Sequence, residues 1–126
     1  MPQVDVVDET FLAVPPPVVA TVFADPAAWP RFWPDLRLDV YADRGAEGLR
    51  WTVRGGLVGT MEVWLEAVLD GTLVHYFLRA DTPGPLTPRR LAAERTRRQL
   101  AAKRVALGLK SVLEAGRAPG VAPEPA

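Results

Sequence analysis

Residues 60–81 constrain the fold most, because their pattern is that of a β-hairpin. Met61, Val63 and Leu65 alternate with polar neighbours, which is the two-residue period of a half-buried strand. Asp70-Gly71 follows and is a strong signal for a two-residue hairpin turn. The segment after the turn alternates in the same way, so the pattern predicts two antiparallel strands with one apolar face.

Three further segments predict strands of the same sheet. Residues 4–13 alternate imperfectly, whereas residues 36–42 and 49–53 alternate regularly between apolar and polar side chains. Gly55-Gly56 ends the last of these strands. The segments 36–42, 49–53 and 60–81 lie close together along the chain, which predicts an antiparallel meander.

Prolines divide the segment between the first two strands into two short helices. Pro15, Pro16 and Pro17 cannot continue a central strand but suit the entry to a helix over residues 18–24. Asp25-Pro26 then supplies an N-cap and a first helical residue for the second helix. Two more prolines limit that helix to about two turns. Its residues are unusually aromatic: Trp29, Phe32 and Trp33.

A long helix is predicted over about residues 88–115, with Pro88 near its start and Gly116 after its end. Arg95 and Arg98 interrupt the first half of its apolar stripe. The stripe that we expect to be buried comprises Leu91, Ala102, Val105, Leu109 and Val112. Residues 1–116 are expected to form a single domain, and residues 117–126, rich in proline and alanine, a disordered tail.

Composition excludes several classes of function. The chain of 126 residues has 15 acidic and 15 basic side chains, whereas nucleic-acid-binding domains are usually basic, so no nucleic acid is expected. It has no cysteine and only one histidine, His75, which excludes thiolate and multi-histidine metal sites within one chain. The sequence shows no secretory signal and no apolar stretch long enough to span a bilayer. We therefore expect a cytoplasmic protein.

The order of strand, two short helices, antiparallel meander and long helix resembles the helix-grip fold of the START-like (SRPBCC) superfamily. Two stretches carry the resemblance, ETFLAVPPPVVATVFADPAAWPRFWPDL and GTMEVWLEAVLDGTLVHYFLRAD. Within the superfamily, the chain is most similar to the bacterial polyketide cyclase/dehydrase-like proteins over about residues 4–115. The resemblance implies an α+β fold in which a curved antiparallel sheet wraps around the long C-terminal helix. Sheets of this family usually have seven strands, so the sheet of about five expected here is shortened.

The resemblance also implies a function. Proteins of this kind hold a hydrophobic or amphipathic small molecule, lipid-like or polyketide-like, in a cavity between the sheet and the C-terminal helix. The alternative is an ordinary packed core. The side chains expected to line such a cavity lie on the apolar strand faces and on the long helix. They are Trp51, Met61, Val63, Leu65, Tyr76, Leu78, Val105 and Leu109.

An enzyme of the polyketide cyclase or dehydrase type, using the same cavity, is the main alternative. Its polar groups would be Tyr76 and His75. The alternation of the strand, however, places His75 on the face opposite Tyr76, towards solvent or a partner. No nucleophile set, phosphate-binding loop or carboxylate cluster is present, so we expect neither catalysis nor a cofactor.

Residues 89–104 contain seven bases and one acid, whereas residues 1–88 have a net charge of −6. One interpretation is an interaction module that docks onto anionic lipid, a phosphate-bearing ligand or RNA. The other, which we favour, is a solvated helix face that complements the acidic part of the same chain. Trp64 and Phe77 share the polar face of the hairpin. Either they cover one another, or they mark the contact of a homodimer.

Overall fold

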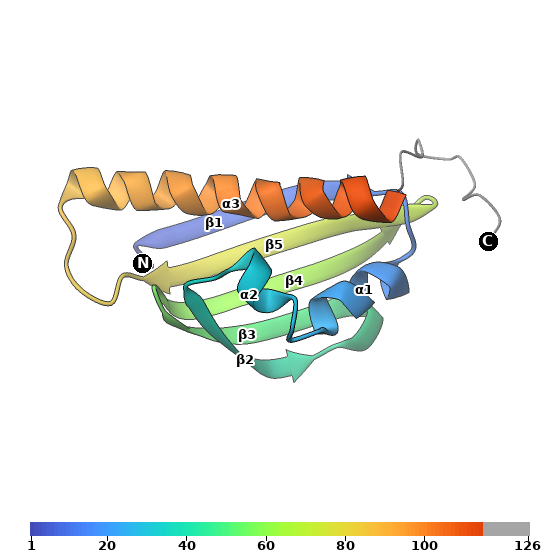
Figure 1. Cartoon of the computed structure of the whole chain (residues 1–126), viewed down its shortest axis with the longest axis horizontal. Helices are drawn as coiled ribbons and strands as arrows, with labels where there is room; N and C mark the ends of the chain where they lie inside the picture. Colours follow the sequence, from blue (N-terminus) through green and yellow to red (C-terminus); the bar gives the residue numbers. More distant parts are fainter. Residues whose placement is uncertain (115–126) are drawn as a thin grey trace.

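The computed structural model describes residues 1–114, which form a five-stranded antiparallel sheet with helices on one face (Figure 1). The strands are β1 (Val4–Leu12), β2 (Leu36–Asp43), β3 (Gly48–Gly55), β4 (Val58–Val68) and β5 (Gly71–Asp81), in the spatial order β1-β5-β4-β3-β2. The helices are α1 (Pro16–Ala24), α2 (Trp29–Phe32) and α3 (Pro88–Glu114), and a 3-10 turn, η1 (Gly45–Glu47), precedes β3.

This architecture confirms the predicted α+β helix-grip fold, with its shortened curved sheet, its two short helices after the first strand and its long C-terminal helix. The predicted disordered tail, residues 117–126, and the predicted end of the domain at residue 116 lie outside the described residues.

The central hairpin pairs as its alternation predicts, but its turn lies one residue earlier. Val68 pairs with Gly71, so Leu69 and Asp70 make the turn, and Leu69 adopts a left-handed backbone with a φ of 53°. Gly71 is the first residue of β5 and lies outside the turn, and the close approach of β1 requires a glycine there. A Cβ at this position would lie 2.2 Å from the carbonyl oxygen of Leu12, so β1 can approach only a glycine.

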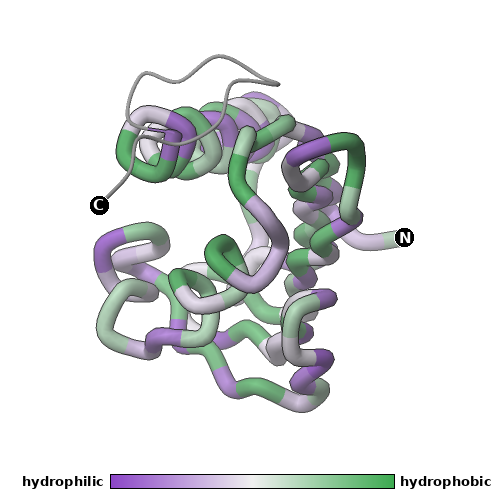
Figure 2. Tube along the Cα trace, turned by 90° about the vertical axis from the view of Figure 1, so that its right-hand side faces the viewer, coloured by the Kyte–Doolittle hydropathy of each residue, from purple (hydrophilic) through white to green (hydrophobic). Residues whose placement is uncertain are grey.

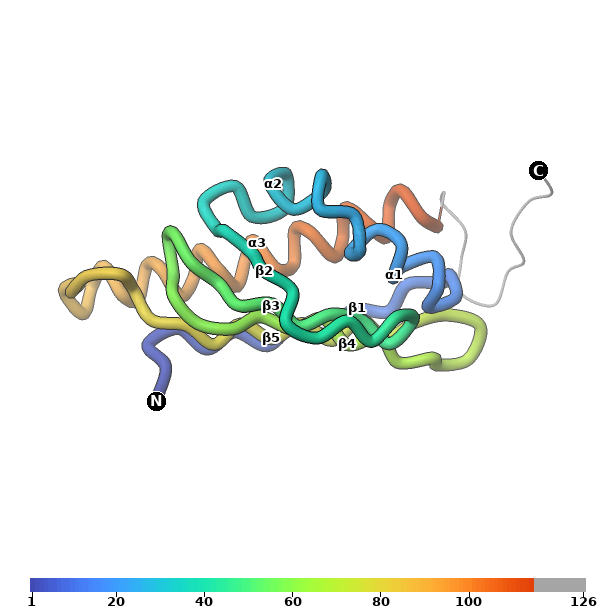
Figure 3. The backbone as a smooth tube through the Cα atoms, turned by 90° about the horizontal axis from the view of Figure 1, so that it is seen from below, coloured from blue at the N-terminus to red at the C-terminus, as the bar shows by residue number. Residues whose placement is uncertain are grey.

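The three described helices lie on the same side of the sheet. α3 runs along β1, while α1 and α2 lie beside it over the remaining strands (Figures 1 and 3). The end-on view of Figure 2 shows that α3 carries both hydrophobic and hydrophilic residues along its turns.

Polar side chains of α3 cover the free edge of the sheet at β1. The side chains of Gln99, Lys103 and Lys110 donate hydrogen bonds to the carbonyl oxygens of residues 7, 9 and 11, at 3.1, 3.2 and 3.0 Å. Arg95 donates in the same way to the carbonyl of residue 3, at 2.7 Å. An unpaired strand edge would otherwise be open to pairing with another chain, and here the long helix closes it.

The segment comprising α1, α2 and the residue after them, here called the aromatic elbow (residues 16–33), packs into the sheet. The ring centroid of Trp33 lies 5.8 Å from that of Trp51 and 6.2 Å from that of Tyr76. Trp29 lies edge-on to Trp51 at 5.7 Å, and its indole N–H donates a 2.7 Å hydrogen bond to the carbonyl of Phe23. The aromatic residues that the sequence places in a short helix therefore fill the interior.

The buried face of α3 differs from the predicted stripe at two positions. Val112, predicted to be buried, is 75% exposed, whereas Arg98, predicted to interrupt the stripe, is only 5% exposed. The reason is that Arg98 finds a carboxylate partner outside the helix, in Asp35. Ala102 and Leu109 are buried as predicted.

Candidate functional site

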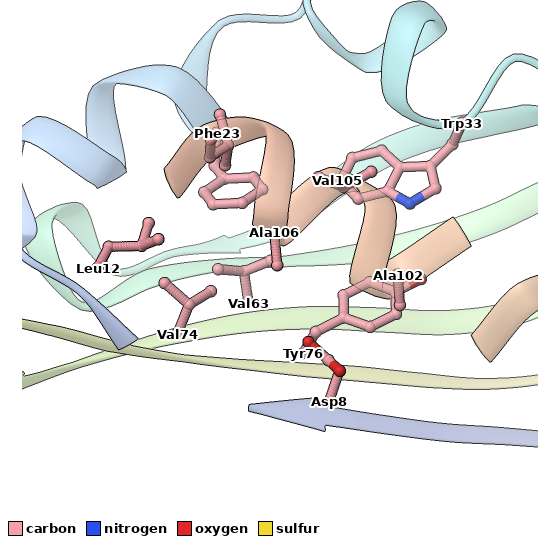
Figure 4. A pocket seen from close by; sticks show the side chains of 11 residues that line it. Asp8, Leu12, Phe23, Trp33, Val63, Val74, Tyr76, Ala102, Val105 and Ala106 are labelled. Carbon is pink, nitrogen blue, oxygen red and sulfur yellow. The ribbon is translucent and has the colours of Figure 1, made fainter. Parts of the chain in front are cut away.

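The interior between sheet and α3 holds a small enclosed cavity of about 20 Å³ (Figure 4). Val63, Val74 and Tyr76 line it from the sheet, Phe23 and Trp33 from the aromatic elbow, and α3 closes it. This space holds about one water molecule, because a water needs roughly 10–15 Å³ measured in this way. The interior is nearly full because the elbow aromatics occupy it.

A much larger space lies between α3 and the aromatic elbow, which we call the α3 groove. Its volume is about 840 Å³, and it opens to solvent. Trp33, Val105 and Leu109 line both the groove and the enclosed cavity, so these side chains form the wall between the two. The remaining apolar lining of the groove includes Phe32, Leu100, Val112 and Leu113.

Two of the lining side chains are large, apolar and strongly exposed. Leu100 is 59% and Val112 75% exposed to solvent. They are twelve residues apart on one helix, so the apolar wall extends over about 18 Å. Solitary exposed apolar residues are common, but here they share a groove with the apolar wall of the core.

The polar end of the groove contains a network of ion pairs. Arg98 donates to both carboxylate oxygens of Asp35, with Nη1 to Oδ1 at 2.9 Å, and to Glu94, with Nε to Oε1 at 2.8 Å. Arg97 binds the same two carboxylates, at 3.4 and 3.0 Å. The hydrogen bond from Arg98 lowers the pKa of Asp35 below its ordinary value of 3.8. Burial disfavours charge on Arg98, but the bonds to Asp35 and Glu94 outweigh it and raise its pKa.

The eight residues predicted to bind ligand fall into two groups. Val63, Tyr76, Val105 and Leu109 meet at the enclosed cavity, and the last two also face the α3 groove. Trp51, Met61, Leu65 and Leu78 are buried in the core and line neither space.

His75 and Tyr76 project from opposite faces of the sheet. The Tyr76 hydroxyl donates to the sulfur of Met61 at 3.2 Å, and burial raises its pKa above the ordinary value, which keeps it neutral. His75 lies on the outer face as its strand parity predicts, but solvent, one of the two surroundings expected for it, reaches little of its side chain. Its side chain is only 9% exposed, because it stacks on Trp64 at 4.3 Å, and the carboxylates of Glu9 and Glu66 lie within 3.3 and 3.1 Å of its ring nitrogens. His75 and Tyr76 therefore cannot act on one bound molecule.

The aromatic pair on the outer face of the hairpin is joined through the same histidine. The ring of His75 lies between Trp64 and Phe77, with the Phe77 centroid at 6.4 Å. Trp64 and Phe77 therefore each pack on His75, and neither the mutual cover nor the dimer contact predicted for them follows from these distances alone.

One ion pair reaches the interior beside the enclosed cavity. The Asp8 carboxylate forms an ion pair with Lys103 Nζ at 2.9 Å and accepts a hydrogen bond from the Thr10 hydroxyl at 3.1 Å. Asp8 lines the cavity, yet its charge is matched by Lys103. Within residues 1–114, no group of three or more histidine or carboxylate side chains is arranged to hold a metal ion.

Sequence reasoning missed three features of the groove. Arg31, Asp35 and Gly108 all line it, but none lies in a recognisable motif. Gly108 carries the only signal, because a glycine inside a helix costs about 1 kcal/mol relative to alanine and therefore calls for a reason.

The basic segment 89–104 is largely satisfied within the chain. Arg95, Arg97, Arg98 and Lys103 each bind a carbonyl or a carboxylate of residues 1–114. This supports the interpretation of a helix face that complements the acidic part of the same molecule. No helix in the described part of the chain is long and apolar enough to cross a membrane.

Comparison with known proteins identifies the fold. No protein-family model matches the chain, and no curated protein matches it. Among solved structures, the Aha1 dimer from Colwellia psychrerythraea is similar, with 16% identity, a TM-score of 0.62 and coverage of 91% of this chain and 99% of that one. DR_A0006 from Deinococcus radiodurans has 15% identity, a TM-score of 0.59 and coverage of 84% and 96%. TTHA0849 from Thermus thermophilus has 16% identity, a TM-score of 0.55 and coverage of 89% and 99%. At these identities the similarity shows a shared fold.

Proposed function

We propose that this chain binds a hydrophobic or amphipathic small molecule, lipid-like or polyketide-like, in the α3 groove. The observation that carries the proposal is the groove itself, an apolar space of about 840 Å³ against the wall of the core. Pockets for small molecules typically measure roughly 300–1,000 Å³ and are mainly apolar. The enclosed cavity of about 20 Å³ is too small for such a molecule, so the groove is the better candidate.

Gly108 supports the proposal, because packing does not explain it. It lies inside α3 and lines the groove, and a Cβ built there would have no atom of residues 1–114 within 4 Å. A glycine that packing does not require destabilises a helix by about 1 kcal/mol relative to alanine. Its effect on the groove is to leave one turn of the wall without a side chain, which widens the space for a ligand.

Substitution of Gly108 tests the proposal, with 1-decanol as a neutral apolar probe. Gly108→Leu should reduce the affinity for decanol at least tenfold, because the new side chain occupies the groove. The same change should raise the free energy of unfolding by roughly 0.5–1 kcal/mol through helix propensity. Ala93→Leu, on an exposed part of α3 outside the groove, is the matched control and should leave decanol binding unchanged.

Calorimetric titration of the three proteins decides the matter. A wild-type chain that binds no decanol, or a Gly108→Leu variant that binds it as well as wild type does, would overturn the proposed site.

We further propose that the chain is a START-like protein of the polyketide cyclase/dehydrase-like group, acting as a binding protein in the cytoplasm and not as a catalyst. The separation of His75 and Tyr76 onto opposite faces supports binding over catalysis.

A homodimer through the outer face of the sheet is a subsidiary proposal. It is supported by the exposure of Val7, Tyr41 and Val58, and sedimentation velocity across a concentration series tests it.

A further inference from the structure

The charges along the α3 groove point to the chemistry of its ligand. We propose that the groove selects an anionic amphiphile, whose head group binds Arg31 and Arg104 while its apolar chain lies along α3. This inference rests on the proposed function and adds the class of ligand. It requires that an anion contact Arg31 and Arg104, whose side chains have no partner within residues 1–114.

Positive charges outnumber negative charges along the α3 groove. Among the described residues, four arginines line the groove, and only one acid, Asp35, lines it with them. Asp35 and the neighbouring Glu94 are already bound by Arg97 and Arg98. Within residues 1–114, the side chains of Arg31 and Arg104 have no ion pair or hydrogen bond, so two positive charges remain unmatched.

Arg31 and Arg104 line the same groove as the apolar wall. Arg104 lies one helical turn from Leu100 on one side and one turn from Gly108 on the other, and all three line the groove. Arg31 lies on the opposite wall, in α2. Guanidinium groups bind carboxylates and phosphates through paired N–H donors, so either anionic head group has the chemistry that these arginines recognise.

The position of the two unmatched arginines along a groove favours a single bound molecule over a membrane surface. Most bases of the segment 89–104 are engaged within the chain, and the unmatched Arg31 and Arg104 flank a groove. A planar bilayer contacts protruding surfaces, whereas charges along a recess suit one molecule that enters it. The proposed occupant is therefore a monomeric amphiphile.

The experiment compares probes that share one apolar chain, by calorimetry below their micellar concentrations. Decanoate and decyl phosphate should bind about tenfold more tightly than 1-decanol, a difference of about 1.4 kcal/mol. Decyltrimethylammonium should bind more weakly than decanol. The ratio between decanoate and decyl phosphate then separates a carboxylate from a phosphate head group. Raising the salt concentration should weaken the anionic probes and leave decanol unaffected.

Two variants assign the effect to the proposed residues. Arg31→Gln and Arg104→Gln should each weaken decanoate binding roughly fivefold and change decanol binding less than about twofold. Arg90→Gln is the matched control, because Arg90 is exposed on the same helix and lies outside the groove.

The outcomes separate this inference from the proposed function. If decanol binds and decanoate binds no more tightly, or if the two variants bind decanoate like wild type, the anionic head group is refuted and the apolar groove stands. If neither probe binds, the proposed function fails as well. If the variants reduce sedimentation with phosphatidylglycerol vesicles but leave decanoate binding unchanged, the arginines serve a membrane surface and the inference is overturned.

Discussion

Replacing Arg98 with methionine tests whether the ion-pair network at the end of the groove holds α3 to the rest of the molecule. The change keeps most of the length of the side chain but removes its hydrogen bonds to Asp35 and Glu94. Breaking a fully buried ion pair costs about 3–5 kcal/mol, because the partner charge is left unmatched. The Asp35 side chain is 38% exposed and keeps Arg97 as a partner, so solvent reduces the penalty. We expect Arg98→Met to lower the free energy of unfolding by about 2–3 kcal/mol.

The pH dependence gives this prediction its second test. Arg98 lowers the pKa of Asp35 in the folded state, so the resulting stability is present above the ordinary pKa of 3.8 and is lost as the pH falls through the lower, folded-state value. The difference between wild type and Arg98→Met should therefore be full at pH 7 and should narrow below about pH 4.

Urea unfolding followed by tryptophan fluorescence measures both effects. Arg90→Met, which changes an exposed arginine on the same helix, is the control and should alter stability by less than about 0.5 kcal/mol. A loss in Arg98→Met no larger than in the control, or a difference that stays constant down to about pH 3, would refute the reasoning.

Three further changes probe the interior and the outer face. Val63→Phe should lower the free energy of unfolding in urea by roughly 1–3 kcal/mol, because the enclosed cavity of about 20 Å³ cannot take the added volume. An unchanged urea midpoint would mean that the interior is more open. Tyr76→Phe should change stability by less than about 1.5 kcal/mol, since the lost hydroxyl donates to the weak acceptor sulfur of Met61 and interacts with the Trp33 side chain, and a larger loss would contradict this weak bonding. His75→Ala should bind decanol with an affinity within about tenfold of that of the wild type in calorimetry, because the imidazole ring stacks on Trp64 outside the groove. A hundredfold loss of affinity would place the imidazole at the ligand.

The sheet and helices are predictable because local patterns specify them. Period-two alternation identifies the hairpin, and Pro16 and Pro34 mark the start of α1 and the end of α2, because both signals act over a few residues. The predicted start of the second helix at Asp25-Pro26 is wrong, since Asp25 caps the end of α1 and α2 begins at Trp29 with Pro30 inside it. The sequence pattern places the turn one residue late, because Asp70-Gly71 has the composition of a hairpin turn. The real constraint on Gly71 is its contact with the carbonyl of Leu12, on a strand about sixty residues earlier in the sequence.

The site is less predictable, because it depends on contacts between distant segments. Helical periodicity cannot show that Arg98 is buried, since its partner Asp35 lies outside the helix. Nor can the apolar strand faces reveal how much space remains between sheet and helix. In this fold Trp33 and its aromatic neighbours occupy that space, which leaves the larger opening on the other side of the wall that they form.

The most direct test of the account is to locate a bound chain by isotope-filtered nuclear Overhauser spectroscopy, with ¹³C-labelled protein and unlabelled decanoate. The account predicts contacts from the decanoate methylenes to the methyl groups of Leu100, Val105 and Val112, which line the groove. Contacts confined to Val7 and Val58 on the outer face of the sheet would contradict it.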